Sequence, residues 1–313
     1  MSDTLGRRSL LSRAGLALGG AVALGSMHAC SDSKDTTTPT PEPQPQVNQF
    51  PYQQFVPASY QLDTAAVKEA AYHGYYAGGC CHGAYSALVK HLADTVGAPF
   101  DQLPLDFGMF GGGGIASYGS ICGAALAGVL VVNSIVPNLG TATLPDAQKN
   151  ARNRMMTELL RWYEQFAFPA YAPAAVDAAE TGLTLAFDGK AGTAAQRIVP
   201  RSHLCHASVT GWCAANGNVP AGGADKKARC ARLTADVAGK VADLLNAYLP
   251  NREFTAATAS LNADCTGCHT AAAVAPAAPV ASGMECKTCH PAASHPFPST
   301  IPHDPASSCD GCH

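Results

Sequence analysis

The sequence predicts a mainly α-helical protein whose last segment has little regular structure. Residues 81–92 and 230–248 carry apolar side chains at helical spacing. No segment shows a convincing alternation of apolar and polar residues, the pattern that indicates strands. The chain from Cys265 onward repeats one cysteine-containing pattern and is poor in large aliphatic residues. We therefore expect a helical domain followed by a C-terminal segment whose apolar mass comes from bound groups.

The helices of the domain are predicted from apolar periodicity and from the residues that stop them. They are expected over residues 62–97, 122–135, 146–168 and 225–249. A Gly78-Gly79 pair interrupts the first helix, and Pro169 and Pro250 stop the third and fourth. Residues 171–201 show no clear pattern of helix or strand. The Gly111–Gly114 run lacks the Lys-Ser/Thr of a phosphate-binding loop, so we expect it to pack closely against a cofactor.

The pattern Cys-x-x-Cys-His occurs three times in the C-terminal segment. It is the attachment pattern of c-type haem, in which two thiols form thioethers and the histidine takes one axial position on the iron. The predicted attachment residues are Cys265, Cys268, Cys286, Cys289, Cys309 and Cys312, and the predicted axial ligands are His269, His290 and His313. Zinc sites pair Cys-x-x-Cys units without requiring a histidine after each, so zinc and a redox dithiol are weaker alternatives. We expect three haem c groups.

Three haems need up to three further axial ligands. The candidates for the second axial position are His82, His206, His295 and His303. His82 and His206 each adjoin a cysteine outside the haem segment, and the other two lie between the second and third haem motifs. A plain structural or surface role is an equal alternative for these histidines. We expect ordinary structural roles for His73 and His91, which lie on helix faces.

The N-terminus predicts export. Arg7-Arg8 precedes a weakly hydrophobic run over residues 14–25, which is typical of a twin-arginine signal and too short and Gly-rich to span a membrane. Cys30 resembles a lipid-attachment site, although Met27 stands where Leu is usual. Residues 31–46 alternate proline with polar residues, which favours an extended tether. A lipid on Cys30 would attach the chain to a membrane.

These patterns divide the chain into four parts. We expect a signal peptide over 1–29, a Pro-rich linker that can carry a lipid anchor over 30–59, a helical Cys-rich redox domain over 60–250 and a triple-haem segment over 251–313. Because haem is joined to Cys-x-x-Cys-His outside the cytoplasm, the expected location is the periplasm or the outer face of the cytoplasmic membrane. A formal net charge of −3 gives no electrostatic reason to expect nucleic acid as a partner.

A second set of cysteines lies outside the haem segment. Its members are Cys80, Cys81, Cys122, Cys205, Cys213 and Cys230. In an exported protein they can be buried core residues or structural disulfides. The alternative is an iron–sulfur centre, which takes about four thiolates from packed elements. Cys81 and Cys230 favour it because each lies on the apolar stripe of a helix, but spacing alone leaves both readings open.

Several of these segments resemble known proteins. Residues 78–84 (GGCCHGA) and 120–124 (SICGA) resemble a redox-active family named for its Cys, Gly-Cys-Ala and later Cys pattern. Leu204–Val209, Trp212-Cys213 and Arg229-Cys230, together with the haem motifs, make residues 60 to 290 similar to the split-Soret cytochromes c. The resemblance implies a dimer that brings its haems together and an iron centre in the Cys-rich domain. The third haem motif and the Cys80-Cys81 pair depart from that pattern, so either cysteine of the pair is a candidate ligand.

The expected function is electron transfer. A multihaem c-type cytochrome with filled axial positions suits a relay between other redox proteins in an anaerobic-type respiratory chain. The alternative is a haem or iron–sulfur reductase of a small inorganic or sulfur compound, but no nucleophile–base pair or arginine cluster marks such a site. Because the haem segment has few large apolar side chains to cover three porphyrins, we also expect a homodimer with haems at its interface.

Overall fold

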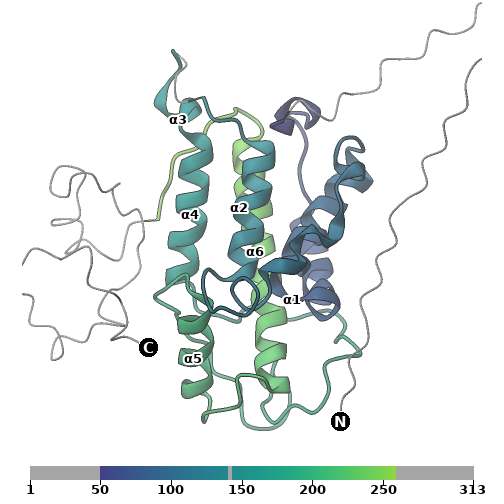
Figure 1. Ribbon diagram of the computed structural model, residues 1–313, viewed down its shortest axis with the longest axis vertical. Helices are drawn as coiled ribbons and strands as arrows, with labels where there is room; N and C mark the ends of the chain where they lie inside the picture. The colour runs from purple at the N-terminus through teal and green to yellow at the C-terminus, as the bar shows by residue number, and fades with distance from the viewer. Residues whose placement is uncertain (1–49, 140–142, 259–313) are drawn as a thin grey trace, which may run out of the picture. The chain divides into compact units, whose positions relative to one another are not determined.

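The computed structural model describes residues 50–139 and 143–258, so the signal region, Cys30 and all three haem motifs lie outside the described residues. Within the described part the regular elements are helices, joined by isolated β-bridges, which confirms the mainly α prediction (Figure 1). No helix in these two ranges is both long enough and apolar enough to span a bilayer.

Four long helices carry most of the core. They are α1 (Thr64–Thr95), α2 (Gly123–Ile135), α4 (Ala151–Gln165) and α6 (Ala224–Tyr248). α1 packs against α6 and α2, while α2 also packs against α4 and α6 (Figure 1). The shorter elements are the 3-10 turns η1 (Tyr52–Phe55), η2 (Phe100–Gln102) and η3 (Leu105–Gly111), and the helices α3 (Asp146–Lys149) and α5 (Cys205–Ala215).

The first long helix folds back on itself at the predicted Gly78-Gly79 interruption. The chain leaves the helical conformation there, and Gly79 has a φ of 84°, which a side chain would disfavour. The two legs then approach so closely that a Cβ on Gly83 would lie 2.8 Å from the carbonyl oxygen of Ala71. The interruption therefore turns α1 into a helical hairpin whose second leg begins with the cysteine pair.

The predicted apolar stripe of α6 is buried against the other long helices. Leu233, Val237, Val241, Leu244 and Tyr248 are all inaccessible to solvent or nearly so. Each such side chain contributes roughly 1.5–3 kcal/mol when it is removed from water. The small residues of α2 let this face approach, because a Cβ on Gly128 would lie 2.6 Å from the side chains of both Leu159 and Val241.

Two helix boundaries differ from the prediction. The helix expected over 146–168 is split by Asn150 into α3 and α4, and α4 ends at Gln165 rather than at Pro169. It ends early because Phe168 exchanges two backbone hydrogen bonds with Ile198, of 2.8 and 2.9 Å, and so leaves the helix for a β-bridge. The short helix α5 was not predicted at all.

The long segment between α4 and α5, which gave little signal in the sequence, is held to α6 by a buried ion cluster. The guanidinium of Arg232 donates to Glu180 at 2.6 Å and to Asp188 at 2.5 Å. The same guanidinium lies 4.6 Å from the ring centre of Phe187. Buried charges of this kind are tolerated only when they are paired, so the segment and α6 depend on each other.

Candidate metal centre

Four cysteines from four separate elements come together at one end of the core. They are Cys80 at the start of the second leg of α1, Cys122 just before α2, Cys205 at the start of α5 and Cys230 in α6. The thiols of Cys80 and Cys122 share a hydrogen bond, and Cys80 also interacts electrostatically with Cys205 and Cys230. The structure therefore joins residues that are far apart along the chain into one sulfur cluster.

Backbone pairing places two of these cysteines beside each other. The N–H of Cys122 donates to the carbonyl oxygen of His203 at 2.9 Å, and Ile121 forms an antiparallel bridge with Leu204. In the same pairing, the N–H of Cys205 donates to the carbonyl oxygen of Ser120 at 2.6 Å. The N-terminal ends of α2 and α5 are thus fixed relative to each other by main-chain hydrogen bonds.

The glycine-rich run makes a left-handed turn against this cluster. Gly113 and Gly114 have positive φ, and so do Ile115, Ala116 and Ser117, for which this conformation is unfavourable by roughly 1–2 kcal/mol each. A Cβ on Gly114 would lie 2.8 Å from the Cβ of Cys205. The turn is consistent with the predicted close packing near a cofactor, and strained backbone of this kind clusters at functional sites.

The adjacent cysteines Cys80 and Cys81 have different surroundings. The thiol of Cys81 is turned to η3, where a Cβ on Gly111 would lie 2.5 Å from its sulfur, and burial raises its pKa to about 11. A Cβ on Gly123 would instead lie 2.7 Å from the sulfur of Cys80. Cys80, rather than Cys81, is therefore the member of the pair that faces Cys122.

The protonation of the cluster is uneven. The hydrogen bond with Cys80 lowers the pKa of Cys122 to about 6 against the opposing effect of burial, with help from the Tyr163 hydroxyl and the N–H groups of Ala124 and Ala125. The same hydrogen bond, together with burial, raises the pKa of Cys80 well above its ordinary value. This setting favours the thiolate form of Cys122 over that of Cys80, and the thiolate is the form of cysteine that binds metals.

The other cysteines of the second set have surroundings of their own. Burial, followed by the neighbouring Cys122 and Cys230, raises the pKa of Cys205 to about 12. Cys213 belongs to a separate apolar group with Trp212 and interacts with Cys230 alone among the cysteines. All six cysteines in the described ranges are free thiols, so the disulfide reading is not realised there.

The four facing thiols form a donor set that fits an iron centre. Soft thiolate ligands from packed elements are what iron–sulfur sites require, and glycines without side chains leave space beside the sulfur of Cys80 and the Cβ of Cys205. In the described ranges no three His, Cys, Asp or Glu side chains are arranged to hold a metal ion as they stand. The thiol side chains would have to change conformation to surround one metal group.

The histidines considered as second axial ligands lie in different surroundings. His82 is 8% exposed, and its Nδ1 atom, which has no hydrogen bond, lies 3.8 Å from a carboxylate oxygen of Asp106. His206 is exposed, and its backbone N–H donates to Gly119 at 3.0 Å. His295 and His303 lie outside the described residues.

The other histidines of the described ranges have partners in the fold. His73 bonds with Asp177 at 2.6 Å, and His91 accepts the backbone N–H of Asp63 at 3.1 Å. His203, which sequence reasoning did not single out, bonds through Nδ1 with Glu164 at 2.8 Å. Its position just before Cys205 is the one signal that could have drawn attention to it.

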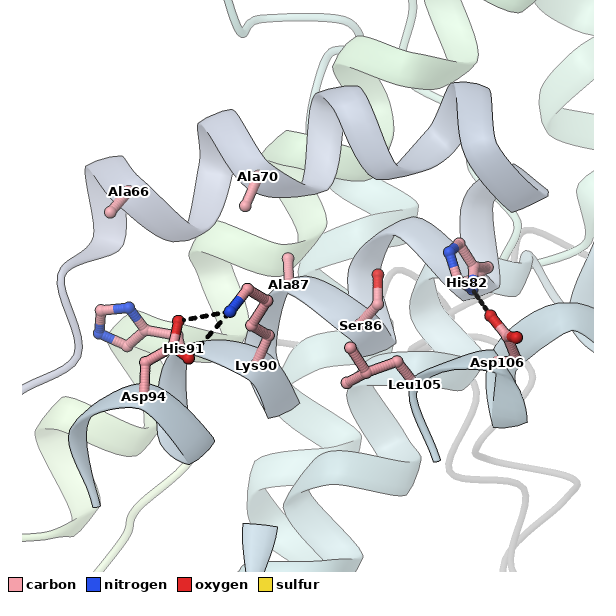
Figure 2. A pocket seen from close by; sticks show the side chains of 10 residues that line it. All are labelled: Ala66, Ala70, His82, Ser86, Ala87, Lys90, His91, Asp94, Leu105 and Asp106. Atoms are coloured by element: carbon pink, nitrogen blue, oxygen red, sulfur yellow. Dashed lines mark hydrogen bonds and ion pairs between the residues drawn. The ribbon is translucent and has the colours of Figure 1, made fainter. Parts of the chain in front are cut away.

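A pocket of about 500 Å³ opens between the two legs of the α1 hairpin and η3 (Figure 2). Ala66 and Ala70 line it from the first leg, and the polar lining comes mainly from the second leg (Figure 2). Lys90 and Asp94 pair with each other at 2.8 Å, so their charges are mutually compensated. His82 closes the other end of the pocket beside Asp106 (Figure 2).

Comparisons with known proteins agree with this arrangement. Residues 80–244 match the C_GCAxxG_C_C family of redox-active proteins. The split-Soret cytochrome c of Desulfovibrio desulfuricans is 32% identical over 268 residues, covering 84% of this chain and 86% of that protein. A solved structure of the split-Soret cytochrome c from Desulfovibrio desulfuricans ATCC 27774, described as having a novel iron centre, matches with a TM-score of 0.60 and 30% identity, covering 75% of this chain and 91% of that one. This chain therefore belongs to the C_GCAxxG_C_C redox-active family and, within it, to the split-Soret cytochromes c.

Proposed function

We propose that this protein is a three-haem electron carrier of an anaerobic-type respiratory chain, with an iron centre at Cys80, Cys122, Cys205 and Cys230. The observation that carries the proposal is the meeting of these four thiols in a chain that also contains three haem-attachment motifs. A protein with both kinds of site can receive an electron at one and deliver it from the other.

The haem assignment follows from the three motifs between Cys265 and His313. Each would attach one haem through two thioethers and bind its iron through the adjacent histidine. His82, His206, His295 and His303 are the candidates for the second axial positions. Two histidine ligands give lower potentials than one histidine and one methionine, which suits an anaerobic electron carrier.

The iron centre would supply a one-electron couple when it is bound. Around it, the protein contributes the Cys122 thiol with its lowered pKa, a first turn of α2 whose N–H groups stabilise negative charge there, and buried positions for Cys80 and Cys122 beside the partly exposed Cys205 and Cys230. The related protein of Desulfovibrio desulfuricans is described as having a novel iron centre, which supports the same assignment here. The expected type is an iron–sulfur cluster.

The proposed partners are other redox proteins and a second copy of this chain. Phe107, Phe110 and Tyr118 are exposed on η3 and the left-handed turn, next to the glycines that contact Cys81 and Cys205. Exposed aromatic side chains of this kind are frequent at docking surfaces. The dimer would cover the porphyrins, and the Arg7-Arg8 signal with a lipid on Cys30 would place the protein at the outer face of the cytoplasmic membrane.

The test is a count of cofactors on the mature full-length chain, purified without oxygen. We expect three covalently bound haems by mass, additional non-haem iron, and acid-labile sulfide in proportion to that iron. Three haems without non-haem iron would remove the second centre from the proposal. Non-haem iron without sulfide would keep the centre but replace the cluster by iron bound to cysteine alone.

A further inference from the structure

A buried arginine stands directly behind the sulfur cluster. Arg229 precedes Cys230 in α6 and is 1% exposed. Its Nη1 lies 3.7 Å from the sulfur of Cys230, and its Nη2 donates to the hydroxyl oxygen of Ser208 at 2.7 Å. Its Nε has no hydrogen-bond partner. The two terminal nitrogens of the guanidinium are therefore directed at Cys230 and Ser208.

Arg229 differs in this respect from Arg232, the other deeply buried arginine of the same helix. Arg232 is neutralised by the carboxylates of Glu180 and Asp188. In the part of the chain that the structure describes, no carboxylate forms an ion pair with Arg229. An uncompensated buried charge costs several kcal/mol, so a negative group close to Arg229 is needed to stabilise the fold.

A chain of hydrogen-bonding side chains continues from Arg229 to the far side of the cluster. Ser208 on α5 accepts from Arg229, and the buried hydroxyl of Tyr163 on α4 lies 3.0 Å from the same serine oxygen. The Tyr163 hydroxyl also bonds with the thiol of Cys122. One guanidinium is thus connected to Cys230 directly and to Cys122 through two hydroxyl groups.

The direction of these bonds suits negatively charged sulfur. In the described arrangement Tyr163 donates to Ser208. Hydroxyl hydrogens rotate, so with Arg229 donating to Ser208, that serine can donate to Tyr163 and Tyr163 to Cys122. Burial alone would lower the pKa of the guanidinium, but Cys230, then Tyr163, raise it above its ordinary value. Arg229 keeps its proton at every accessible pH.

We propose that Arg229 is a positioning residue and the fixed countercharge of the sulfur centre, acting on Cys230 directly and on Cys122 through Ser208 and Tyr163. The inference rests on the proposed iron centre and adds a property to it. A permanent positive charge stabilises the more negative, reduced state, so Arg229 raises the reduction potential. Reduction adds one electron, delivered by a one-electron redox protein. It breaks no bond, and the fixed positive charge of Arg229 lowers the electrostatic cost of the added electron.

The experiment is a redox titration of the non-haem iron signal, followed by electron paramagnetic resonance, on the mature full-length holoprotein. Arg229→Met removes the charge and keeps much of the side-chain volume. We expect at least a tenfold shift of the equilibrium toward the oxidised centre, which corresponds to a potential about 59 mV lower for a one-electron couple. Arg229→Lys keeps the positive charge but not the planar guanidinium, so its reduction potential should stay close to that of the wild type.

Two further variants test the hydroxyl relay. Ser208→Ala and Tyr163→Phe keep the charge of Arg229 but break its connection to Cys122. Each should lower the potential by less than Arg229→Met does. If Arg229→Met does not accumulate as folded protein, these two variants carry the test, and unchanged potentials in both would overturn the proposal.

Arg232→Met is the matched control, because it removes an equally buried arginine of α6 that has no sulfur partner. It should lower thermal stability and leave the potential of the folded protein unchanged. An equal potential shift in Arg229→Met and Arg232→Met, or in Arg229→Met and Arg229→Lys, would overturn the proposal. A wild-type protein without non-haem iron would show that the proposed iron centre is wrong. An iron centre whose reduction potential is the same in wild type and Arg229→Met would leave the centre in place and overturn only the role of Arg229.

Discussion

Cys80 and Cys122 share a thiol–thiol hydrogen bond that separates their pKa values in opposite directions. Cys122 is pushed toward the thiolate and Cys80 is held as the thiol. This division follows from position, because Cys122 lies at the N-terminal end of α2, where the free N–H groups stabilise negative charge. A metal group entering the cluster therefore meets one ligand, Cys122, that loses its proton more readily than Cys80.

The two adjacent cysteines of α1 should respond differently to substitution. Cys80→Ser removes a sulfur that faces Cys122, so we expect loss of most non-haem iron while the three haems remain. Cys81→Ser changes a thiol that faces Gly111 and should leave the iron content close to that of the wild type. Iron and haem analysis of both proteins checks this. Loss of iron in Cys81→Ser with retention in Cys80→Ser would reverse the assignment.

Iron binding should also depend on the free space beside the cysteine sulfurs. In Gly123→Ala the new methyl group would lie 2.3 Å from the carbonyl oxygen of Gly111 and 2.7 Å from the sulfur of Cys80. We expect destabilisation of roughly 1–3 kcal/mol and a lower iron content. Gly222→Ala is the control, since nothing lies within 4 Å of its added Cβ. Urea denaturation and iron analysis compare the two, and equal behaviour would contradict the crowding.

Asp236 should make stability depend on pH between about 4 and 6. Burial raises its pKa from 3.8 to about 6, against the opposing hydrogen bonds from the N–H groups of Ala170 and Tyr171. The stabilisation of the folded protein by the protonated Asp236 carboxyl is therefore fully present below the unfolded pKa. It is lost as the pH rises through the folded pKa, and the free energy of unfolding falls by about 3 kcal/mol. Asp236→Asn should remove this dependence.

The measurement for Asp236 is the difference in unfolding free energy between wild type and Asp236→Asn, taken by urea denaturation at about pH 4 and pH 7. Taking the difference cancels the titration of all groups that the two proteins share. The variant should gain stability relative to wild type as the pH rises. A difference that stays constant over this range would show that the Asp236 carboxyl titrates normally.

The buried ion cluster should be worth far more than a surface pair. Arg232→Met leaves Glu180 and Asp188 without their partner, and we expect a loss of about 3–5 kcal/mol. The exposed Lys90–Asp94 pair is the control, and Lys90→Met should cost about 0–1 kcal/mol. Urea denaturation measures both, and similar losses would mean that water reaches the Arg232 cluster.

The haem count and the dimer are tested together on protein in which a cleavable export signal without a lipid-attachment cysteine replaces residues 1–46. The Cys309→Ser/Cys312→Ser double variant should reduce the mass by one haem while leaving two attached. Light scattering should give the mass of two subunits, and close haems in the dimer should split the Soret band of the reduced protein. A monomer with a single unsplit band would contradict the proposed interface.

The spin state of the haem iron separates the two candidate functions. Haem iron that is entirely six-coordinate and low-spin would favour an electron relay over a reductase.

Some features of the fold could be predicted because they depend on local pattern. The stripe from Leu233 to Tyr248 predicts α6, since one apolar face at helical spacing must be buried. The Gly78-Gly79 interruption could be predicted because glycine tolerates the backbone angles of a sharp turn. The short helix α5 could not, because carbonyl groups of Gly119 and Ser120, far away in the sequence, accept its first N–H groups. The end of α4 is likewise set by a distant partner, Ile198.

The sequence by itself determined the chemistry of this protein: haem-attachment motifs from Cys265 to His313, a second group of thiols and a helical framework to hold them. Only the tertiary structure decided which thiols meet. Neighbouring residues of a helix point roughly 100° apart, so the rotation of the second α1 leg after Gly79 selects Cys80 over Cys81. The role of Arg229 was equally invisible, because Ser208 and Tyr163, which connect it to Cys122, lie on other helices that packing alone brings together.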